Sequence, residues 1–201
     1  MKECLLCTKR LADTPSWKSL LGLDQQTIIC EDCSKKFQRA EIKEEDTSVL
    51  DKVTSLYTYN EAMRDYLHQF KFLQDIALSS VFANELRVHL PKDAVIVPIP
   101  MHREKRIVRT FAQVDELLNS AGVPFVHLLE KTGTEVMGEK TKAGRLTMKP
   151  LFKLIGPLAI EQKTVILVDD IYTTGTTLRH AATVLKEAGA ERVEAVTLIR
   201  A

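Results

Sequence analysis

The sequence contains no long hydrophobic run, almost no net charge and no cysteine beyond residue 33. No apolar stretch approaches the roughly 18–20 residues that are needed to cross a bilayer, and the start of the chain lacks the apolar core of a signal peptide. These absences predict a protein that does not insert into a membrane and stays in the cytoplasm. The formal net charge of +1 gives no general reason to bind nucleic acid or an anionic membrane, so such contacts would have to come from a local patch.

The length of 201 residues and the apolar content of 45% predict one α/β domain of ordinary size with a small appendage. Residues 1–40 hold every cysteine and the only tryptophan, and the charged stretch 41–46 (EIKEED) is typical of a solvated linker. We therefore divide the chain into a small module over residues 1–45 and a larger domain over residues 46–201.

The cysteines form two CxxC pairs, Cys4 with Cys7 and Cys30 with Cys33. A reducing compartment disfavours disulfides, and two such pairs can complete a closed tetrahedral site of four sulfurs. A module of this size cannot bury enough surface to fold alone, so a structural Zn²⁺ would supply the missing stability. The alternatives are a redox CxxC and buried cysteines without a ligand, but two pairs at this separation favour zinc.

The larger domain is predicted to alternate between strands and helices. The expected strands are 53–59, 94–99, 124–129, 164–168 and 192–199, and the expected helices are 61–72, 76–90, one near 111–121 and 176–188. Asn60 is expected to cap the first helix, and Gly122 and Gly189 to end the last two. The strand–helix–strand ending predicts a right-handed crossover and a largely parallel sheet flanked by helices.

The segment 165–177 (VILVDDIYTTGTT) carries the most chemical information. A buried strand brings Asp169 and Asp170 to the carboxyl edge of the sheet, where ligands of such folds bind. A turn rich in threonine then opens a helix, whose first backbone N–H groups favour a phosphate, and Gly175 allows close backbone approach. No lysine follows that glycine as in a Walker A loop. The alternative is that the acids end a strand and the threonines cap a helix.

This segment resembles the signature of type I phosphoribosyltransferases, which bind phosphoribosyl pyrophosphate (PRPP). The resemblance implies that Asp169 and Asp170 contact the ribose hydroxyls, directly or through Mg²⁺. It also implies that the turn holds the 5-phosphate, through Thr173, Thr174, Gly175, Thr176 and Thr177.

A basic elbow follows the strand at 94–99, and its residues are Pro100, Met101, His102, Arg103, Arg106 and Arg109. In phosphoribosyltransferases the equivalent strand end carries the pyrophosphate loop, where positive charge stabilises the leaving group. The three arginines recur every three residues and would share one side of a helix. The alternatives are an exposed basic face without a ligand and a contact strip for single-stranded DNA or RNA. That strip lacks interleaved aromatics, because only Phe111 is nearby.

Two further segments are ambiguous. Residues 131–145 contain three glycines and the cations Lys131, Lys140, Lys142 and Arg145, and they form either a loop that closes over the ligands or an ordinary surface loop. His68 and Lys71 lie on the expected helix 61–72, and we interpret His68 as structural.

The whole chain resembles the ComF family. The resemblance rests on the paired CxxC motifs, the YTY strand at 57–59, the HQFKF helix at 68–72, the VPIP strand end at 97–100, the basic elbow and the phosphate segment. It implies a role in natural competence, the uptake of transforming single-stranded DNA, with a ComFA-type competence helicase as an expected partner. Such partners would hold the protein at the inner face of the membrane.

The sequence departs from the family at one motif. Members usually carry Arg-Gly-Phe-Asn-Gln after the elbow, whereas Thr110 and Ala112 stand here in place of glycine and asparagine. These changes leave PRPP binding intact as an expectation but weaken the case for transfer chemistry. We therefore predict a competence protein that binds PRPP with Mg²⁺ and leave open whether it is an active glycosyltransferase. The acceptor is unknown, and the alternative is an enzyme of nucleotide metabolism or salvage.

Overall fold

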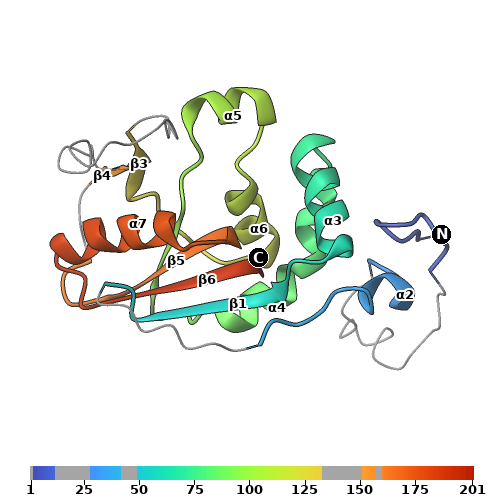
Figure 1. Ribbon diagram of the computed structural model, residues 1–201, viewed down its shortest axis with the longest axis horizontal. Coiled ribbons are helices and arrows are strands. Elements are labelled where there is room, and N and C mark those ends of the chain that lie inside the picture. Colours follow the sequence, from blue (N-terminus) through green and yellow to red (C-terminus); the bar gives the residue numbers. More distant parts are fainter. Residues whose placement is uncertain (1, 12–27, 42–48, 133–150, 157–159) are drawn as a thin grey trace.

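The computed structural model describes residues 2–11, 28–41, 49–132, 151–156 and 160–201 (Figure 1). Its central sheet has four parallel strands in the order β1–β6–β5–β2. Their bounds are Lys52–Thr58 for β1, Val95–Pro98 for β2, Thr164–Tyr172 for β5 and Arg192–Arg200 for β6. The predicted α/β fold with a largely parallel sheet is confirmed.

The helices of the larger domain surround this sheet. They are α3 (Glu61–Phe72), the 3₁₀ helix η1 (Ile76–Phe82), α4 (Ala83–His89), α5 (Arg103–Arg109), α6 (Gln113–Ala121) and α7 (Thr176–Glu187). The two short strands β3 (Leu129–Lys131) and β4 (Phe152–Leu154) form a separate antiparallel pair. The pair lies near α7, at the opposite end of the molecule from the N-terminal segment (Figure 1).

Two hydrophobic cores cover the two faces of the sheet. Along β5, Ile166 and Val168 face a core shared with α3, η1, α4 and α6, whereas Val165 and Leu167 face a core shared with α7, β3 and β4. This strand is buried on both faces over its first half, as a continuous apolar run in a parallel sheet requires. The result is a three-layer arrangement in which the carboxyl ends of β2 and β5 lie side by side.

Several local predictions are confirmed. Helix α3 has the expected bounds, and the side chain of Asn60 accepts a hydrogen bond from the Met63 backbone N–H at 3.0 Å. Helix α6 ends at Gly122, which takes the left-handed conformation at φ +63°. Helix α7 ends one residue before its predicted bound, and β6 extends one residue beyond its own.

Other local predictions are wrong. The expected helix 76–90 begins as a 3₁₀ helix and becomes α-helical only at Ala83. Ser79 and Ser80 donate to carbonyl oxygens three residues earlier, both at 2.6 Å, which suits the tighter 3₁₀ turn. No strand covers residues 124–128 of the described chain, because the strand there starts only at Leu129. Phe111 precedes α6 instead of lying on it, since Thr110 breaks the backbone at φ +61°.

The cysteine segment packs against the larger domain. The backbone of residues 38–40 runs along β1, with an antiparallel bridge between Arg39 and Tyr57. The Phe37 ring lies 5.1 Å from that of Phe82 and 6.1 Å from that of Tyr57. The predicted linker lies almost entirely outside the described residues, as does the boundary at 45/46.

Candidate functional site

The acid pair lies inside β5 instead of following it, because the strand continues to Tyr172. Asp169 faces Thr197 of β6 in the parallel register. The backbone N–H of Asp170 donates to Oδ1 of Asp169 at 2.8 Å. Burial raises the pKa of Asp169 to about 8, and the neighbouring charge of Asp170 adds to the effect. The pair therefore presents one carboxyl group that stays protonated at neutral pH and one that is available for an ion pair.

The turn after β5 leads directly into α7. Gly175 takes φ +69°, and the hydroxyl groups of Thr174 and Thr176 lie 2.9 Å apart. Arg179 donates to the Thr174 carbonyl at 2.5 Å and so holds the turn against the helix. Of the five residues predicted to bind the 5-phosphate, Thr177 lines the cavity described next, while Thr173, Thr174 and Thr176 are exposed beside it and Gly175 is buried.

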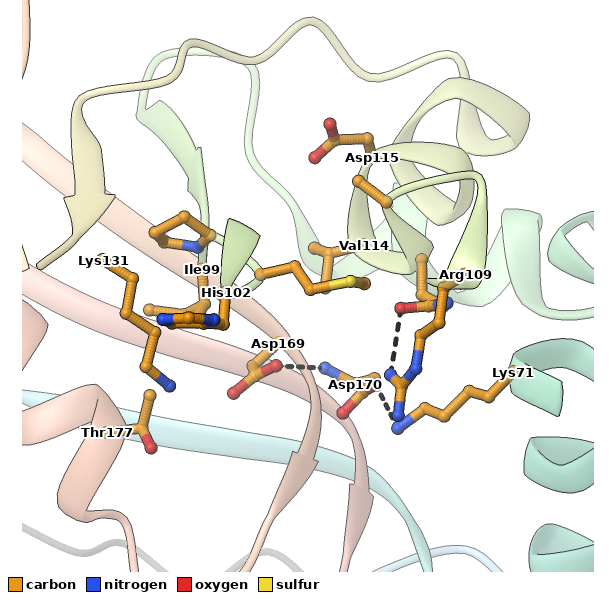
Figure 2. Close-up of a pocket in the computed structure, with 14 residues that line it drawn as sticks. Lys71, Ile99, His102, Arg109, Val114, Asp115, Lys131, Asp169, Asp170 and Thr177 are labelled. Atoms are coloured by element: carbon orange, nitrogen blue, oxygen red, sulfur yellow. Dashed lines mark hydrogen bonds and ion pairs between the residues drawn. The ribbon is translucent and has the colours of Figure 1, made fainter. Parts of the chain in front are cut away.

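A cavity of about 230 Å³ lies over the acid pair (Figure 2). Besides the acids and Thr177, its wall contains Lys71 from α3, residues of the segment after β2, the first turn of α6 and Lys131 from β3. From the predicted elbow it takes Pro100, Met101, His102 and Arg109. Arg106 lines a neighbouring cavity instead, and the side chain of Arg103 lies outside the described part.

Two cations meet on the α3 side of the cavity. Lys71 forms an ion pair with Asp170, and the two side chains are only 12% and 13% exposed. Arg109 donates to Oε1 of Gln113 at 3.3 Å. Gln113 is 2% exposed, and its Nε2 has no hydrogen-bond partner among the described residues. A buried amide donor without a partner at a cavity wall is suited to a ligand oxygen.

Sequence reasoning missed Gln113 as a member of this site and left the roles of Lys71 and Lys131 open. Lys71 and Asp169 are separated by 97 residues, and no local pattern connects them. The one available signal for Gln113 was its place in the family motif after the elbow.

A second cavity of about 740 Å³ adjoins the first and shares part of its wall, including Met101, Ala112 and Asp115. Its own lining adds Ile107, Leu129, Ile155 and His127. His127 Nε2 lies 3.3 Å from Oδ2 of Asp115, and burial raises the pKa of Asp115 while the facing histidine partly offsets the rise. The side chain at Ala112 is small and lies between the two cavities.

An exposed aromatic ring adjoins the elbow. Phe72 is 63% exposed, its ring lies 5.5 Å from the guanidinium of Arg109, and the His68 ring lies 5.6 Å away. Phe111, by contrast, is buried against Phe70. The expectation that only Phe111 accompanies the basic elbow was therefore wrong, because Phe72, the last residue of α3, lies beside Arg109, the last residue of α5.

The four cysteines lie together. Their sulfur atoms are all within 4.8 Å of one another, as a tetrahedral metal–sulfur site requires. Cys30 donates its backbone N–H to the Cys4 sulfur at 3.2 Å. Burial raises the pKa of Cys4, but backbone donors outweigh it and lower that pKa to about 6. The donor set and its spacing fit a metal ion such as Zn²⁺.

Comparison with known proteins agrees with these features. The phosphoribosyl transferase domain family matches residues 112–201. A hypoxanthine phosphoribosyltransferase from Staphylococcus aureus aligns with 61% of this chain and 62% of its own at 19% identity, but its TM-score of 0.37 is too low to carry a conclusion. Among the described residues, no helix has the length and apolar character of a membrane span.

Two curated proteins match nearly the whole chain. Competence protein ComFC of Streptococcus pneumoniae is 32% identical over 98% of this chain and 100% of its own length. Competence protein ComFC of Bacillus subtilis is 30% identical over 98% of this chain and 94% of its own. The chain therefore belongs to the ComFC family of competence proteins and carries a phosphoribosyltransferase domain.

Proposed function

We propose that the protein acts in natural transformation, in the uptake or handling of single-stranded DNA, and that its phosphoribosyltransferase domain binds PRPP. The observation that carries the binding proposal is the single cavity into which β5, the start of α7 and the elbow together direct Asp169, Asp170, Thr177 and Arg109. Carboxyl groups suit ribose hydroxyls, and a helix start with threonine hydroxyls suits a 5-phosphate. Arginine suits a pyrophosphate.

Metal ions would have separate roles. Mg²⁺ bound with PRPP would neutralise the pyrophosphate, while Asp169 and Asp170 would contact the ribose hydroxyls. Zn²⁺ held by the four cysteines would be structural, because four sulfur ligands leave no open position. We assign the zinc module to residues 1–45 and the PRPP-binding domain to residues 46–201.

The role in transformation is tested in the organism that encodes the protein. The chromosomal gene is replaced by the variant Asp169→Asn/Asp170→Asn, with Asp93→Asn as the control, since Asp93 is exposed at the opposite edge of the sheet. Transformation frequency should fall in the double variant and stay unchanged in the control. Normal transformation by a null mutant of the gene would contradict the role in competence.

A second function is an active phosphoribosyltransferase of nucleotide metabolism. The observation in its favour is the second cavity, whose apolar wall and Asp115–His127 pair adjoin the first. Such a space would admit an acceptor beside bound PRPP. Pyrophosphate release measured across a panel of nucleobases tests this function, and release with none of them while PRPP still binds would favour a binding role.

Single-stranded DNA is the proposed macromolecular ligand, with a competence helicase as the partner protein. Support comes from Phe72 and Arg109, which place an exposed ring and a guanidinium side by side. Bases stack on exposed aromatic rings, and arginines contact both rings and phosphates. This surface lies beside the cavity, because Arg109 belongs to both.

A further inference from the structure

Lys71 reaches from the last turn of α3 to the acid pair on β5 (Figure 2). We propose that its ammonium group takes the place of a divalent cation beside Asp170, so that the ribose 5-phosphate half of PRPP binds without Mg²⁺. The proposal rests on the proposed function of the same cavity. It assigns Mg²⁺ to the pyrophosphate alone.

The position of Lys71 is fixed by a well-packed helix. Three residues of α3, Met63, Tyr66 and Phe70, are at most 1% exposed, and the Tyr66 hydroxyl donates to the carbonyl of Leu78 at 3.2 Å. The lysine is itself 12% exposed although it lies in the last turn of the helix. Its ion pair is therefore a built part of the cavity wall and not a loose surface contact.

An ammonium group can do what the metal would do at this carboxylate. It carries a positive charge and three N–H donors. One donor is used by Asp170, which leaves two for hydroxyl or phosphate oxygens in the cavity. Mg²⁺, by contrast, demands near-octahedral oxygen coordination, and reaching Asp170 would strand a largely buried lysine.

The charges that line the cavity leave an excess of positive charge without a metal. Asp169 is kept protonated by burial, so two carboxylates, Asp115 and Asp170, face three cations, and these cations are Lys71, Arg109 and Lys131. A sugar phosphate that enters this cavity meets cations already in place. A metal bound to the acid pair is therefore not needed to offset the charge of the carboxylates.

The test is calorimetric titration of the full-length, zinc-loaded protein with ribose 5-phosphate, which lacks the pyrophosphate. Titrations are compared in millimolar Mg²⁺ and in buffer freed of Mg²⁺ on a chelating resin, with zinc content checked before and after. We expect the wild-type dissociation constant to change less than about twofold between the two buffers. Lys71→Met should weaken binding about tenfold in the Mg²⁺-free buffer, with Mg²⁺ restoring most of the loss.

Two further variants keep the result interpretable. Lys71→Arg retains the positive charge and should bind ribose 5-phosphate like the wild type in both buffers. This expectation can be tested even if Lys71→Met folds poorly. Lys131→Met removes a different cation of the same cavity and should weaken binding equally in both buffers. If Lys131→Met shows the same rescue by Mg²⁺ as Lys71→Met, the effect is a general loss of charge and the proposal fails.

The remaining outcomes separate this proposal from the proposed function. Wild-type binding that requires Mg²⁺ would overturn the role of Lys71 and leave the ribose 5-phosphate site standing. Equal affinities of Lys71→Met and the wild type for ribose 5-phosphate in both buffers would also overturn the role of Lys71 and leave the site standing. Absence of binding by the wild type in either buffer would overturn the site itself.

Discussion

At the scale of single residues, Gly175 controls the turn between β5 and α7. A Cβ atom added there would lie 2.5 Å from the Tyr172 hydroxyl oxygen and 2.8 Å from Nη1 of Arg179, at a φ of +69°. We expect Gly175→Ala to lower the free energy of unfolding by about 1–2 kcal/mol from the backbone alone, with a further loss from the contacts. Binding of ribose 5-phosphate should weaken as well, since the Arg179 side chain, which donates to the Thr174 carbonyl of the turn, must move.

The matched control for this substitution is Gly156→Ala. Gly156 also has a positive φ, +82°, but an added Cβ would meet nothing within 4 Å. Gly156→Ala should therefore lower the free energy of unfolding through backbone strain alone, without a loss from close contacts, and should leave ligand binding unchanged. Equal destabilisation of the two variants in chemical denaturation would show that the close packing at Gly175 is unimportant.

Asp169 makes stability depend on pH in a defined direction. Its pKa is raised to about 8 in the folded chain by burial, whereas an unfolded aspartate ionises near pH 3.9. Between these values the folded state binds the extra proton, so this residue's contribution makes stability fall as pH rises from about 4 to 8. Asp169→Asn removes the contribution and keeps an oxygen that can accept from the Asp170 N–H.

The measurement is urea unfolding of both proteins at pH 5 and pH 7. The advantage of Asp169→Asn over the wild type should grow by at most about 1.4 kcal/mol per pH unit over this range. A difference between the two proteins that is constant with pH would mean that Asp169 is ionised throughout.

At the scale of elements, the last residues of α3 and α5 meet, and there Phe72 and Arg109 form the proposed DNA surface. Phe72→Ala removes the exposed ring and Arg109→Ala removes the cation above it. Each should weaken binding of a fluorescent single-stranded oligonucleotide about tenfold in anisotropy titrations, because a stacked base contributes about 1–3 kcal/mol. Only the arginine variant should also lower the slope of log affinity against log salt, by about 1 for a single phosphate contact.

Tyr59→Ala provides the aromatic control. Tyr59 is also exposed, at 46%, but it precedes α3 and lies at the other end of that helix from Phe72. Its loss should leave the affinity unchanged. An equal loss of affinity in all three variants, or no loss in any of them, would show that this surface does not bind DNA.

The elements also show how far sequence reasoning reaches. Helix α3, the strand that carries Asp169 and Asp170, and the helix after Gly175 follow from local patterns of caps, apolar runs and glycine. The pairing of Lys71 with Asp170 does not, since it depends on how distant elements pack. The same holds for Phe72 beside Arg109. The wrong strand at 124–128 arose because a short apolar run says little about whether a partner strand is available.

At the scale of the whole molecule, the cysteine segment packs against the larger domain but does not contribute to the lining of the cavity among the described residues. Leu5, Leu6 and Phe37 pack against the core beside α3, whereas the described residues that line the cavity all lie at or beyond Lys71. Removing zinc with a chelator should therefore lower the melting temperature of the full chain and leave PRPP affinity nearly unchanged at a temperature where the larger domain stays folded.

Elemental analysis should find one zinc ion per chain, and the double variant Cys4→Ser/Cys33→Ser should contain no zinc. Protein that holds no zinc when purified without chelator would contradict the structural site. Loss of PRPP binding by zinc-free protein with an intact larger domain would contradict the independence of the two parts.

Asp169 and Asp170, with the start of α7, form the proposed PRPP-binding site. Its most direct test is calorimetric titration of PRPP with Mg²⁺ into the wild type, Asp169→Asn/Asp170→Asn and the distant control Asp93→Asn. We expect saturable binding by the wild type and the control, and binding at least about tenfold weaker in the double variant. No heat from the wild type, or equal affinity of the double variant, would contradict it.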